Sequence, residues 1–350
     1  MRLSMGKVAH YRSLPRRFRR RTLLLVGCGD VGGRIGRLLA RHARDRLRVV
    51  GTARSDEQIA RLRGLGIVPL RVDLDDARTL PRLAAFSDWM VDLAPPPDAG
   101  PADPRSVHLI AALSRRYPRP ARVGPAAAGG RHASPSTAPP RRWVYVSTTG
   151  VYGDCAGAEF DETRPVAPRN ERAVRRVEAE RRFREATRRA AARASPLAPV
   201  RAAILRVPGI YGHDRLPLER LRRRLPALAT DEDVFTNHIH ADDLARLCWA
   251  AVFRGMPGRV VHAVDDSDLK MGDYFDLVAQ AFDLPRPPRI SRAELAATVS
   301  PVMLSFMSES RRLRNRRLKR ELRVRLRWPT VESTLADAAR GLSDAAGKSV

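Results

Sequence analysis

The chain has 350 residues and carries 65 Lys and Arg against 38 Asp and Glu, a formal net charge of +27 at pH 7. Only four of the basic residues are lysine, and the arginines are spread along the whole length together with abundant Ala and Pro. This pattern indicates a coding bias more than a selected phosphate-binding face, so we expect no nucleic-acid partner. No run of about 18 apolar residues is present, which excludes a membrane-spanning helix and leaves ample length for a globular core.

Residues 1–21 are basic and lack an apolar segment, so we expect a disordered basic arm and no secretory signal. An Arg-rich organelle-targeting segment is the alternative. The three cysteines, Cys28, Cys155 and Cys248, form no C-x-x-C pair and have no histidine at zinc spacing. They predict a reducing compartment without structural disulfides or a metal site. We therefore expect a cytoplasmic protein.

The first structured segment is expected at Leu23–Val26, a continuous apolar run typical of a strand buried on both faces. A G-x-G-x-x-G motif follows at once, and an amphipathic helical pattern comes after it. Strand, glycine turn and helix are the three parts of a dinucleotide site, in which the helix N-terminus binds the pyrophosphate. The predicted pyrophosphate contacts are Gly27, Gly29, Asp30, Val31 and Gly32. Cys28, inside the turn, is expected to be a packing residue.

The second expected strand, Leu47–Arg54, predicts the cofactor preference. In sites that prefer NAD, the end of this strand carries an acid for the ribose 2′-hydroxyl, but here it carries Arg54, followed by Ser55. An arginine suits a 2′-phosphate, so NADP is favoured and NAD remains the alternative. Asp56 and Glu57 follow closely and moderate this preference.

Strands and helices alternate from residue 22 to residue 212, which predicts βαβ units and a parallel, doubly wound α/β sheet of the Rossmann type. Residues 117–141 interrupt this order with a stretch dense in Pro, Ala, Gly and Ser, expected to be a disordered insertion. The further expected strands are Ile67–Val72, Trp89–Pro97 (running into a proline-rich loop), Trp143–Ser147 and Ala202–Val207; the helices are Asp56–Leu65, Pro104–Arg116 and Arg169–Arg193.

From Ser147 onward the chain resembles the extended short-chain dehydrogenase/reductases, the NAD(P)-dependent epimerase/dehydratase superfamily. The segments that carry the resemblance, in order, are S-T-T-G-V-Y-G at 147–153, D-E-T at 161–163, L-R-V-P-G-I-Y-G at 205–212 and N-H-I-H-A-D-D-L-A at 237–245. Two later runs, 267–275 and 304–312, are similar to the atypical YeeZ-like branch. The resemblance spans roughly residues 22–330.

The resemblance implies a Rossmann core with a small substrate-capping region built mainly after Tyr211. The expected division is a core at 22–212, cap segments at 213–235 and 266–340, a return to the core at 236–265 and a tail at 341–350. Asp73 and Leu74 would contact the adenine, with ordinary turn chemistry as the alternative. Leu93, Ala94 and Pro95 lie where open α/β folds bind ligands, at the carboxyl edge of the sheet. The family also favours a homodimer.

The chain departs from the family at the glycine motif, which is usually G-x-x-G-x-x-G, and at the catalytic residues. The family uses Ser, Tyr and Lys, the last two as Y-x-x-x-K. Ser147 is assigned to the serine position, but no tyrosine lies between Tyr152 and Tyr211. Arg172 and Arg176 have the four-residue spacing of the missing pair. Arginine can hold a ribose or an anion, but its pKa above about 12 makes it a poor proton donor.

Other residues could exchange the proton. Tyr152 is the first candidate, with packing as the alternative. His238 and His240 could titrate near neutrality, but their segment is expected mainly to start a helix. Asp161 and Glu162 could do acid–base work, although such pairs are more often solvated or capping.

The segment Arg311–Arg327 is basic with regularly spaced leucines. We expect a helix that covers the substrate region with a solvated arginine face, or one or two arginines that face an anionic substrate. The sequence thus predicts an NADP-preferring oxidoreductase or epimerase/dehydratase-like enzyme that acts on a small molecule. A noncatalytic NADP(H)-binding sensor is the alternative, because the fold alone does not establish activity.

Overall fold

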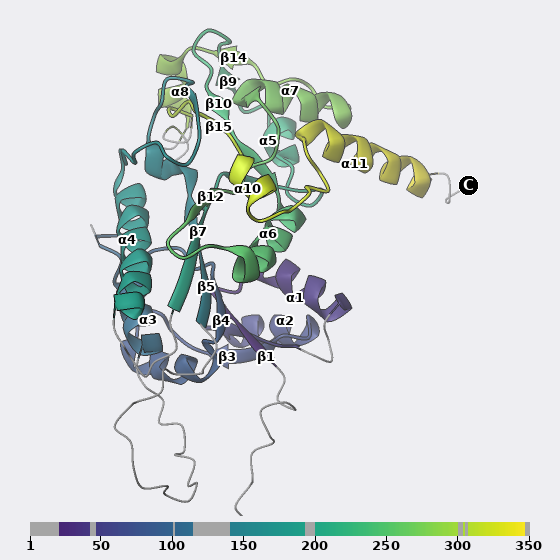
Figure 1. Cartoon of the computed structure of the whole chain (residues 1–350). Helices are drawn as coiled ribbons and strands as arrows, with labels where there is room; N and C mark the ends of the chain where they lie inside the picture. Colours follow the sequence, from purple (N-terminus) through teal and green to yellow (C-terminus); the bar gives the residue numbers. More distant parts are fainter. Residues whose placement is uncertain are drawn as a thin grey trace, which may run out of the picture.

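The computed structural model describes residues 21–42, 47–100, 102–114, 141–192, 200–299, 304 and 307–346. The expected N-terminal arm and the 117–141 insertion lie outside the described residues, except for their last residues, Arg21 and Arg141. A seven-stranded parallel sheet forms the centre of the molecule, in the order β12-β7-β5-β4-β1-β2-β3 (Figure 1). Its strands are β1 (Arg21–Val26), β2 (Leu47–Ala53), β3 (Val68–Arg71), β4 (Trp89–Asp92), β5 (Arg141–Thr148), β7 (Val200–Val207) and β12 (Val260–His262). The predicted doubly wound α/β class is confirmed.

Helices cover both faces of this sheet, and strand β1 shows why. Its side chains alternate, so Leu23 and Leu25 pack into one hydrophobic cluster while Leu24 and Val26 pack into another. The first cluster includes residues of α1 (Asp30–His42), α2 (Asp56–Gly64) and α6 (Ala241–Arg254); the second includes η2 (Ala77–Phe86), α3 (Pro104–Ser114) and α4 (Glu171–Ala192).

The direction of winding reverses between β1 and β4, because β2 and β3 extend the sheet on one side while β4, β5 and β7 extend it on the other. In open α/β sheets ligands bind outside the carboxyl ends of the strands at this point. The glycine turn follows β1 and the proline-rich loop follows β4. Both predicted ligand-binding segments therefore lie at the switch point.

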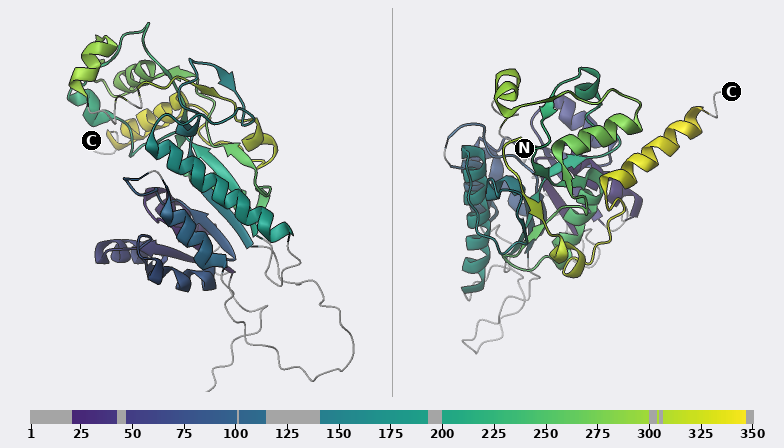
Figure 2. Two further views of the ribbon diagram at one scale, coloured as in Figure 1. Left: turned by 90° about the vertical axis from the view of Figure 1, so that its left-hand side faces the viewer. Right: turned by 90° about the horizontal axis from the view of Figure 1, so that it is seen from above.

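Short elements above the carboxyl ends of the strands form the cap (Figures 1 and 2). They include two-stranded pairs between segments far apart in the sequence, such as β6 (Glu159–Phe160) with β15 (Arg312–Leu313). A parallel pair, β8 (Gly209–Tyr211) with β11 (His238–His240), leads from the core into the cap. The remaining elements are η3 (Thr149–Tyr152), α5 (Leu218–Arg222), β9 (Ala227–Leu228), β10 (Phe235–Thr236), β13 (Leu269–Lys270), α7 (Met271–Ala281), β14 (Arg289–Ile290), α8 (Arg292–Thr298), α10 (Arg316–Arg320) and α11 (Val331–Ala346).

The structure corrects two predictions near the C-terminus. Residues 311–327 do not form one helix, because only β15 and the five-residue α10 are regular and Arg323 has a positive φ of 49°. Leu318, Leu322 and Leu326 pack into the core cluster beside β5 and β7 and not over the substrate region. The C-terminal helix α11 continues to Ala346, past the expected start of the tail at residue 341. Among the described residues, no helix is long and apolar enough to cross a membrane.

Candidate functional site

The three motif glycines are required for different physical reasons. Gly27 has a positive φ of 70°, and a Cβ there would lie 2.5 Å from Cα of Ala94. A Cβ on Gly32 would lie 2.7 Å from Sγ of Cys28, so this glycine allows α1 to pack on the turn. Gly29 differs, because a Cβ there would meet nothing nearer than 4.0 Å. The protein itself leaves space at Gly29, which fits the close approach of a phosphate to the backbone.

Asp30 is the first residue of α1, and its carboxylate is already engaged by protein groups. Its Oδ2 accepts hydrogen bonds from Nε of Arg34 at 3.0 Å and from Nη1 of Arg215 at 2.9 Å. Asp30 and the half-buried Val31 would thus contribute backbone N–H groups to a phosphate, as the first turn of a helix does. Cys28 is 6% exposed and packs in the first core cluster, as expected, and burial raises the pKa of its thiol to about 11.

Arg54 follows β2 at the carboxyl edge of the sheet, where the sequence predicts the 2′-phosphate. Its carbonyl accepts from Nη1 of Arg71 at 3.0 Å, and Ser55 caps α2 by accepting from the N–H of Gln58 at 3.2 Å. Arg71 also forms an ion pair with Asp56. One of the two acids that moderated the NADP prediction, Asp56, is thereby paired with an arginine that the sequence analysis did not consider.

The strand ends after β3 and β4 hold the other predicted cofactor contacts. Oδ1 of Asp73 accepts from the N–H of Asp75 at 3.0 Å, and Leu74 packs at the edge of the second core cluster. These are turn and packing contacts, and contact of either residue with an adenine stays a prediction. Leu93 continues the β4 ladder by donating to the carbonyl of Val26 at 2.9 Å. Ala94 lies against the glycine turn.

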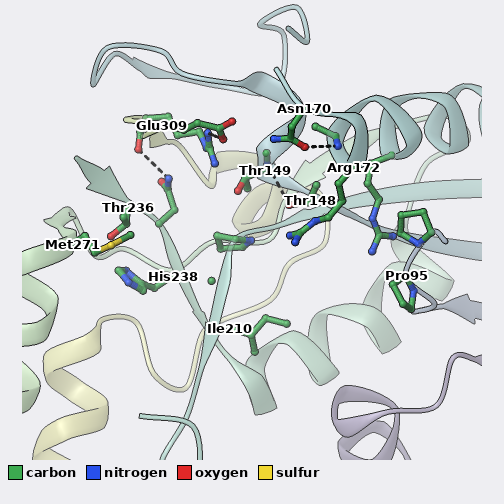
Figure 3. A pocket seen from close by; sticks show the side chains of 18 of the residues that line it. Pro95, Thr148, Thr149, Asn170, Arg172, Ile210, Thr236, His238, Met271 and Glu309 are labelled. Carbon is green, nitrogen blue, oxygen red and sulfur yellow. Dashed lines mark hydrogen bonds and ion pairs between the residues drawn. The ribbon is translucent and has the colours of Figure 1, made fainter. Parts of the chain in front are cut away.

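A cavity of about 1100 Å³ lies between the carboxyl ends of the strands and the cap (Figure 3). The proline-rich loop, the end of β5 and the first turns of α4 form one wall, and β8, β11 and the cap form the other. Its lining residues are Pro95–Asp98, Thr148–Gly150, Asn170–Ala173, Arg175, Arg176, Pro208–Tyr211, Phe235–His238, Met271, Tyr274, Phe275, Glu309 and Arg311.

Ser147 does not line this cavity, which corrects its assignment as the residue that contacts the substrate. Its side chain is 3% exposed, and Oγ donates to Oε1 of Glu180 at 2.7 Å. Successive residues of a strand point to opposite sides, so Ser147 faces α4 while Thr148 reaches the cavity. The sequence contains hydroxyl side chains at both positions and thus does not show which one faces the ligand.

Tyr152 is also directed away from the cavity, which argues against the proposed acid role. Its hydroxyl accepts from Nη1 of Arg206 at 2.5 Å and lies 2.6 Å from Nε2 of His262. Burial raises the pKa of Tyr152 to about 12 and lowers that of His262 to about 3. Tyr152 is 1% exposed and belongs to a buried polar network, so it is a packing and hydrogen-bonding residue.

Arg172 and Arg176 line the cavity from the start of α4, as their spacing predicts. Figure 3 shows Arg172 in this position. Nη1 of Arg176 donates to the carbonyl of Val146 at 2.9 Å and to that of Ala94 at 3.3 Å. It therefore joins the ends of β4 and β5 at the switch point. Burial and the neighbouring charge of Arg176 lower the pKa of Arg172.

The two histidines of β11 have different roles. Nδ1 of His240 caps α6 by accepting from the N–H of Asp242 at 3.2 Å, and its ring stacks on Trp328. His238 instead lines the cavity beside Tyr274, and its buried Nδ1 has no hydrogen-bond partner in the described part of the chain. Burial lowers the pKa of His238 to about 4, so the imidazole is neutral at pH 7. Nothing in the sequence distinguishes it from His240.

The remaining acid–base candidates are structural. Oδ1 of Asp161 accepts from the N–H of Thr163 at 2.9 Å, which stabilises a turn. Oε1 of Glu162 accepts from the N–H of His262 at 3.0 Å, and its other oxygen pairs with Arg317. Neither carboxylate lines the cavity.

Comparisons with known proteins agree with this arrangement. Residues 23–102 match the family described as the saccharopine dehydrogenase NADP binding domain. Comparison with the sequences of curated proteins gives no significant match. Among solved structures, a functionally unknown conserved protein from Silicibacter pomeroyi is similar, with 25% identity, a TM-score of 0.68 and coverage of 92% of this chain and 99% of the other.

Two further solved structures carry a described activity. The UDP-glucose 4-epimerase of Thermotoga maritima, with UDP-glucose, has a TM-score of 0.67 at 14% identity and covers 93% of this chain and 99% of its own. The dTDP-glucose 4,6-dehydratase of Bacillus anthracis, in complex with NAD, has a TM-score of 0.66 at 13% identity, with coverage of 93% and 97%. The chain has the fold of these epimerase/dehydratase proteins, which confirms the resemblance to the extended short-chain dehydrogenase/reductases at the level of fold.

Proposed function

We propose that this chain, which has the extended short-chain dehydrogenase/reductase fold, is an NADP(H)-dependent oxidoreductase or epimerase/dehydratase-like enzyme that acts on a small molecule. One observation carries the proposal. One cavity extends from the loop after β4 (Pro95), the end of β5 (Thr148) and the start of α4 (Arg176) to cap residues such as His238. A cavity of about 1100 Å³ is large enough for a substrate beside a nicotinamide ring.

The residues present fit a dinucleotide. The open backbone at Gly29 and the first turn of α1 would hold the pyrophosphate, and Arg176, which donates to the carbonyl of Ala94, would contact the nicotinamide ribose. The bound nicotinamide would supply hydride transfer at its ring carbon. Arg54 would hold a 2′-phosphate, because Asp56 is occupied by Arg71 and no longer opposes an anion there.

The chain's own contribution to the chemistry would come from three cavity residues. The O–H of Thr148 can donate a hydrogen bond to a substrate oxygen while a lone pair of the same oxygen accepts from the N–H of Gly150. The guanidinium of Arg172 can stabilise negative charge that develops on that oxygen. The neutral imidazole of His238 can accept or return a proton. Arg172 and Arg176 do neither at neutral pH.

The cationic first turns of α4 favour a substrate that carries a carboxylate or phosphate. Arg172, Arg175 and Arg176 all line the cavity, with Arg311 on the opposite side beside Glu309. Arg175 and Arg311 are held by backbone carbonyls, so their positions are set before a ligand arrives. Arginines held in this way pair well with planar anions.

A noncatalytic NADP(H)-binding protein is the second candidate, and one observation favours it. The cavity has neither tyrosine nor lysine at the positions of Y-x-x-x-K, and Ser147 and Tyr152 are sealed in the buried network with Glu180 and Arg206. Such a protein would bind the cofactor and respond to its redox state without turnover.

The test begins with purified, cofactor-free protein titrated with NADPH and with NADH, followed by nicotinamide fluorescence. Binding of NADPH at least about 10-fold tighter than NADH, a difference of about 1.4 kcal/mol, is the expected result. The complex is then offered small carbonyl compounds in matched pairs with and without a carboxylate or phosphate, and NADPH oxidation is recorded. Oxidation that needs both the anionic group and Arg172 supports the enzyme. Binding without NADPH oxidation and without conversion of any compound supports the sensor, because an epimerase or dehydratase would convert its substrate while regenerating the cofactor. Absence of binding excludes both.

A further inference from the structure

The segment that leads from β8 into the cap lies beside the N-terminus of α1, the helix that follows the glycine turn. The chain leaves β8 at Tyr211 and turns at once, with the N–H of Arg215 donating to the carbonyl of Gly212 at 2.8 Å. The turn places Nη1 of Arg215 2.9 Å from Oδ2 of Asp30. Asp30 directly follows Gly29, where the backbone is open, so the Arg215 guanidinium lies at the N-terminus of α1.

This turn is anchored before any ligand binds. Arg34, which is 7% exposed, holds three carboxylates that come from different parts of the chain. They are Asp30 on α1 at 3.0 Å, Asp242 on α6 at 2.8 Å and Asp214 in the turn at 2.5 Å. Because Asp214 precedes Arg215, the buried Arg34 also determines where Arg215 lies. A side chain positioned in this way loses less entropy when it binds a ligand.

Of the two arginines in this cluster, Arg215 is the one that can bind a further anion. The carboxylates of Asp30, Asp214 and Asp242 surround the two guanidinium groups of Arg34 and Arg215, so the cluster is acidic by one charge. A pyrophosphate at the helix N-terminus would lie beside the Asp30 carboxylate and be repelled by it. Arg34 is fully engaged by its three partners. Among the described residues Arg215 has one ion-pair partner, Asp30, and its side chain is 37% exposed, so it can turn to an anion.

We propose that Arg215 binds the pyrophosphate of the nicotinamide dinucleotide and thereby couples the first segment of the substrate cap to the cofactor. This inference rests on the proposed cofactor binding and adds a contact from outside the glycine turn. A guanidinium can donate two parallel hydrogen bonds to phosphate oxygens, which neutralises the ligand and shields it from Asp30. Cofactor binding would then stabilise the turn at 212–215 and, through it, the wall of the cavity at Tyr211.

The test measures affinity for defined ligands and needs no substrate. Wild type, Arg215→Ala and Arg215→Gln are titrated with NADPH and with adenosine 2′-monophosphate, which carries the 2′-phosphate but no pyrophosphate. The matched control is Arg222→Ala, an exposed arginine at the end of α5. Unfolding by urea shows whether each variant is folded.

Loss of a charged hydrogen bond predicts NADPH binding that is about 10-fold weaker or more in both Arg215 variants, with the Arg222 variant unchanged. Affinity for adenosine 2′-monophosphate should stay within about 2-fold of wild type in all proteins. Equal NADPH affinity of wild type and the Arg215 variants would overturn this inference alone, as would equal weakening for both ligands, which indicates a structural role. Failure of wild type to bind NADPH would overturn the proposed function itself.

Discussion

The hydroxyl of Ser147 donates to Oε1 of Glu180 over 2.7 Å, and both side chains are almost fully buried. Glu180 also accepts two hydrogen bonds from Arg206, at 3.0 and 2.7 Å. The serine that the resemblance assigns to the substrate thus completes the hydrogen bonding of a buried ion pair behind the cavity. Thr148, the next residue along the strand, is the hydroxyl at the cavity wall.

Substitution at these two positions should therefore have opposite effects. Ser147→Ala should leave turnover of any substrate and NADPH affinity within about 2-fold, but lower the free energy of unfolding by about 1–2 kcal/mol, because Glu180 loses a partner. Thr148→Val should lower kcat by about 10-fold or more, as the loss of one hydrogen bond to an oxyanion does. Activity and urea unfolding are measured for both variants. Thr148→Ser is the control and should keep the activity of wild type, because serine retains the hydroxyl. Loss of activity in Ser147→Ala but not in Thr148→Val would contradict this prediction and show that Ser147 is the catalytic hydroxyl.

The buried ion pair of Arg206 and Glu180 should contribute more to the stability of the protein than to ligand binding or turnover in the cavity. The two side chains are 3% and 1% exposed, so removal of one partner leaves a buried charge uncompensated. Arg206→Met is expected to reduce the free energy of unfolding by about 3–5 kcal/mol. The double variant Arg206→Met/Glu180→Met removes both charges and should regain part of this loss. Urea unfolding tests the pair, and additive losses in the double variant would contradict the coupling.

Much of the fold could be predicted from residue patterns, because buried parallel strands are short apolar runs between amphipathic helices. The start of β4 and both ends of α3 agree with the sequence prediction within two residues, whereas β4 ends at Asp92 and not at Pro97. The strand β12 was not predicted, because its three residues carry no period of their own. The basic segment after Arg311 was predicted wrongly as one helix, since leucine spacing alone does not show that Arg312–Leu313 form a strand and that α10 ends at Arg320.

The site was predictable where one local motif determines it and not where distant segments meet. The glycine turn and the pair Arg172 and Arg176 follow from spacing along the chain. His238 reaches its place through pairing of β8 with β11. Arg215 reaches its place through the anchoring role of Arg34, which is 180 residues away from Asp214 in the sequence. The choice between Ser147 and Thr148 depends on which face of β5 meets α4, and a run of adjacent hydroxyl residues does not encode that choice.

The preference for NADP should depend on Arg54 directly and on Arg71 indirectly. Arg54→Ala removes the expected partner of the 2′-phosphate, so NADPH binding should weaken by about 10-fold while NADH binding stays the same. Arg71→Ala releases the Asp56 carboxylate from its ion pair, and the exposed negative charge should also weaken NADPH binding selectively. Fluorescence titration with NADPH and with NADH gives the ratio of the two dissociation constants for each variant. Arg63→Ala on the exposed face of α2 is the control. A ratio unchanged by Arg54→Ala would remove the basis for the preference.

Asp92, the last residue of β4, should make the stability of the protein depend on pH. Burial raises the pKa of its carboxyl to about 7, while one N–H, that of Ala94, donates to it at 3.1 Å. Between pH 4 and 7 the folded state therefore holds a proton that the unfolded state has released, so this group's contribution to stability falls as pH rises. Asn keeps the acceptor oxygen without the charge. Asp92→Asn should thus gain stability over wild type by about 2 kcal/mol when the pH is raised from 5 to 7. Urea unfolding of both proteins at several pH values measures the difference. A difference that does not change with pH would show that Asp92 is ionised in the folded protein throughout this range.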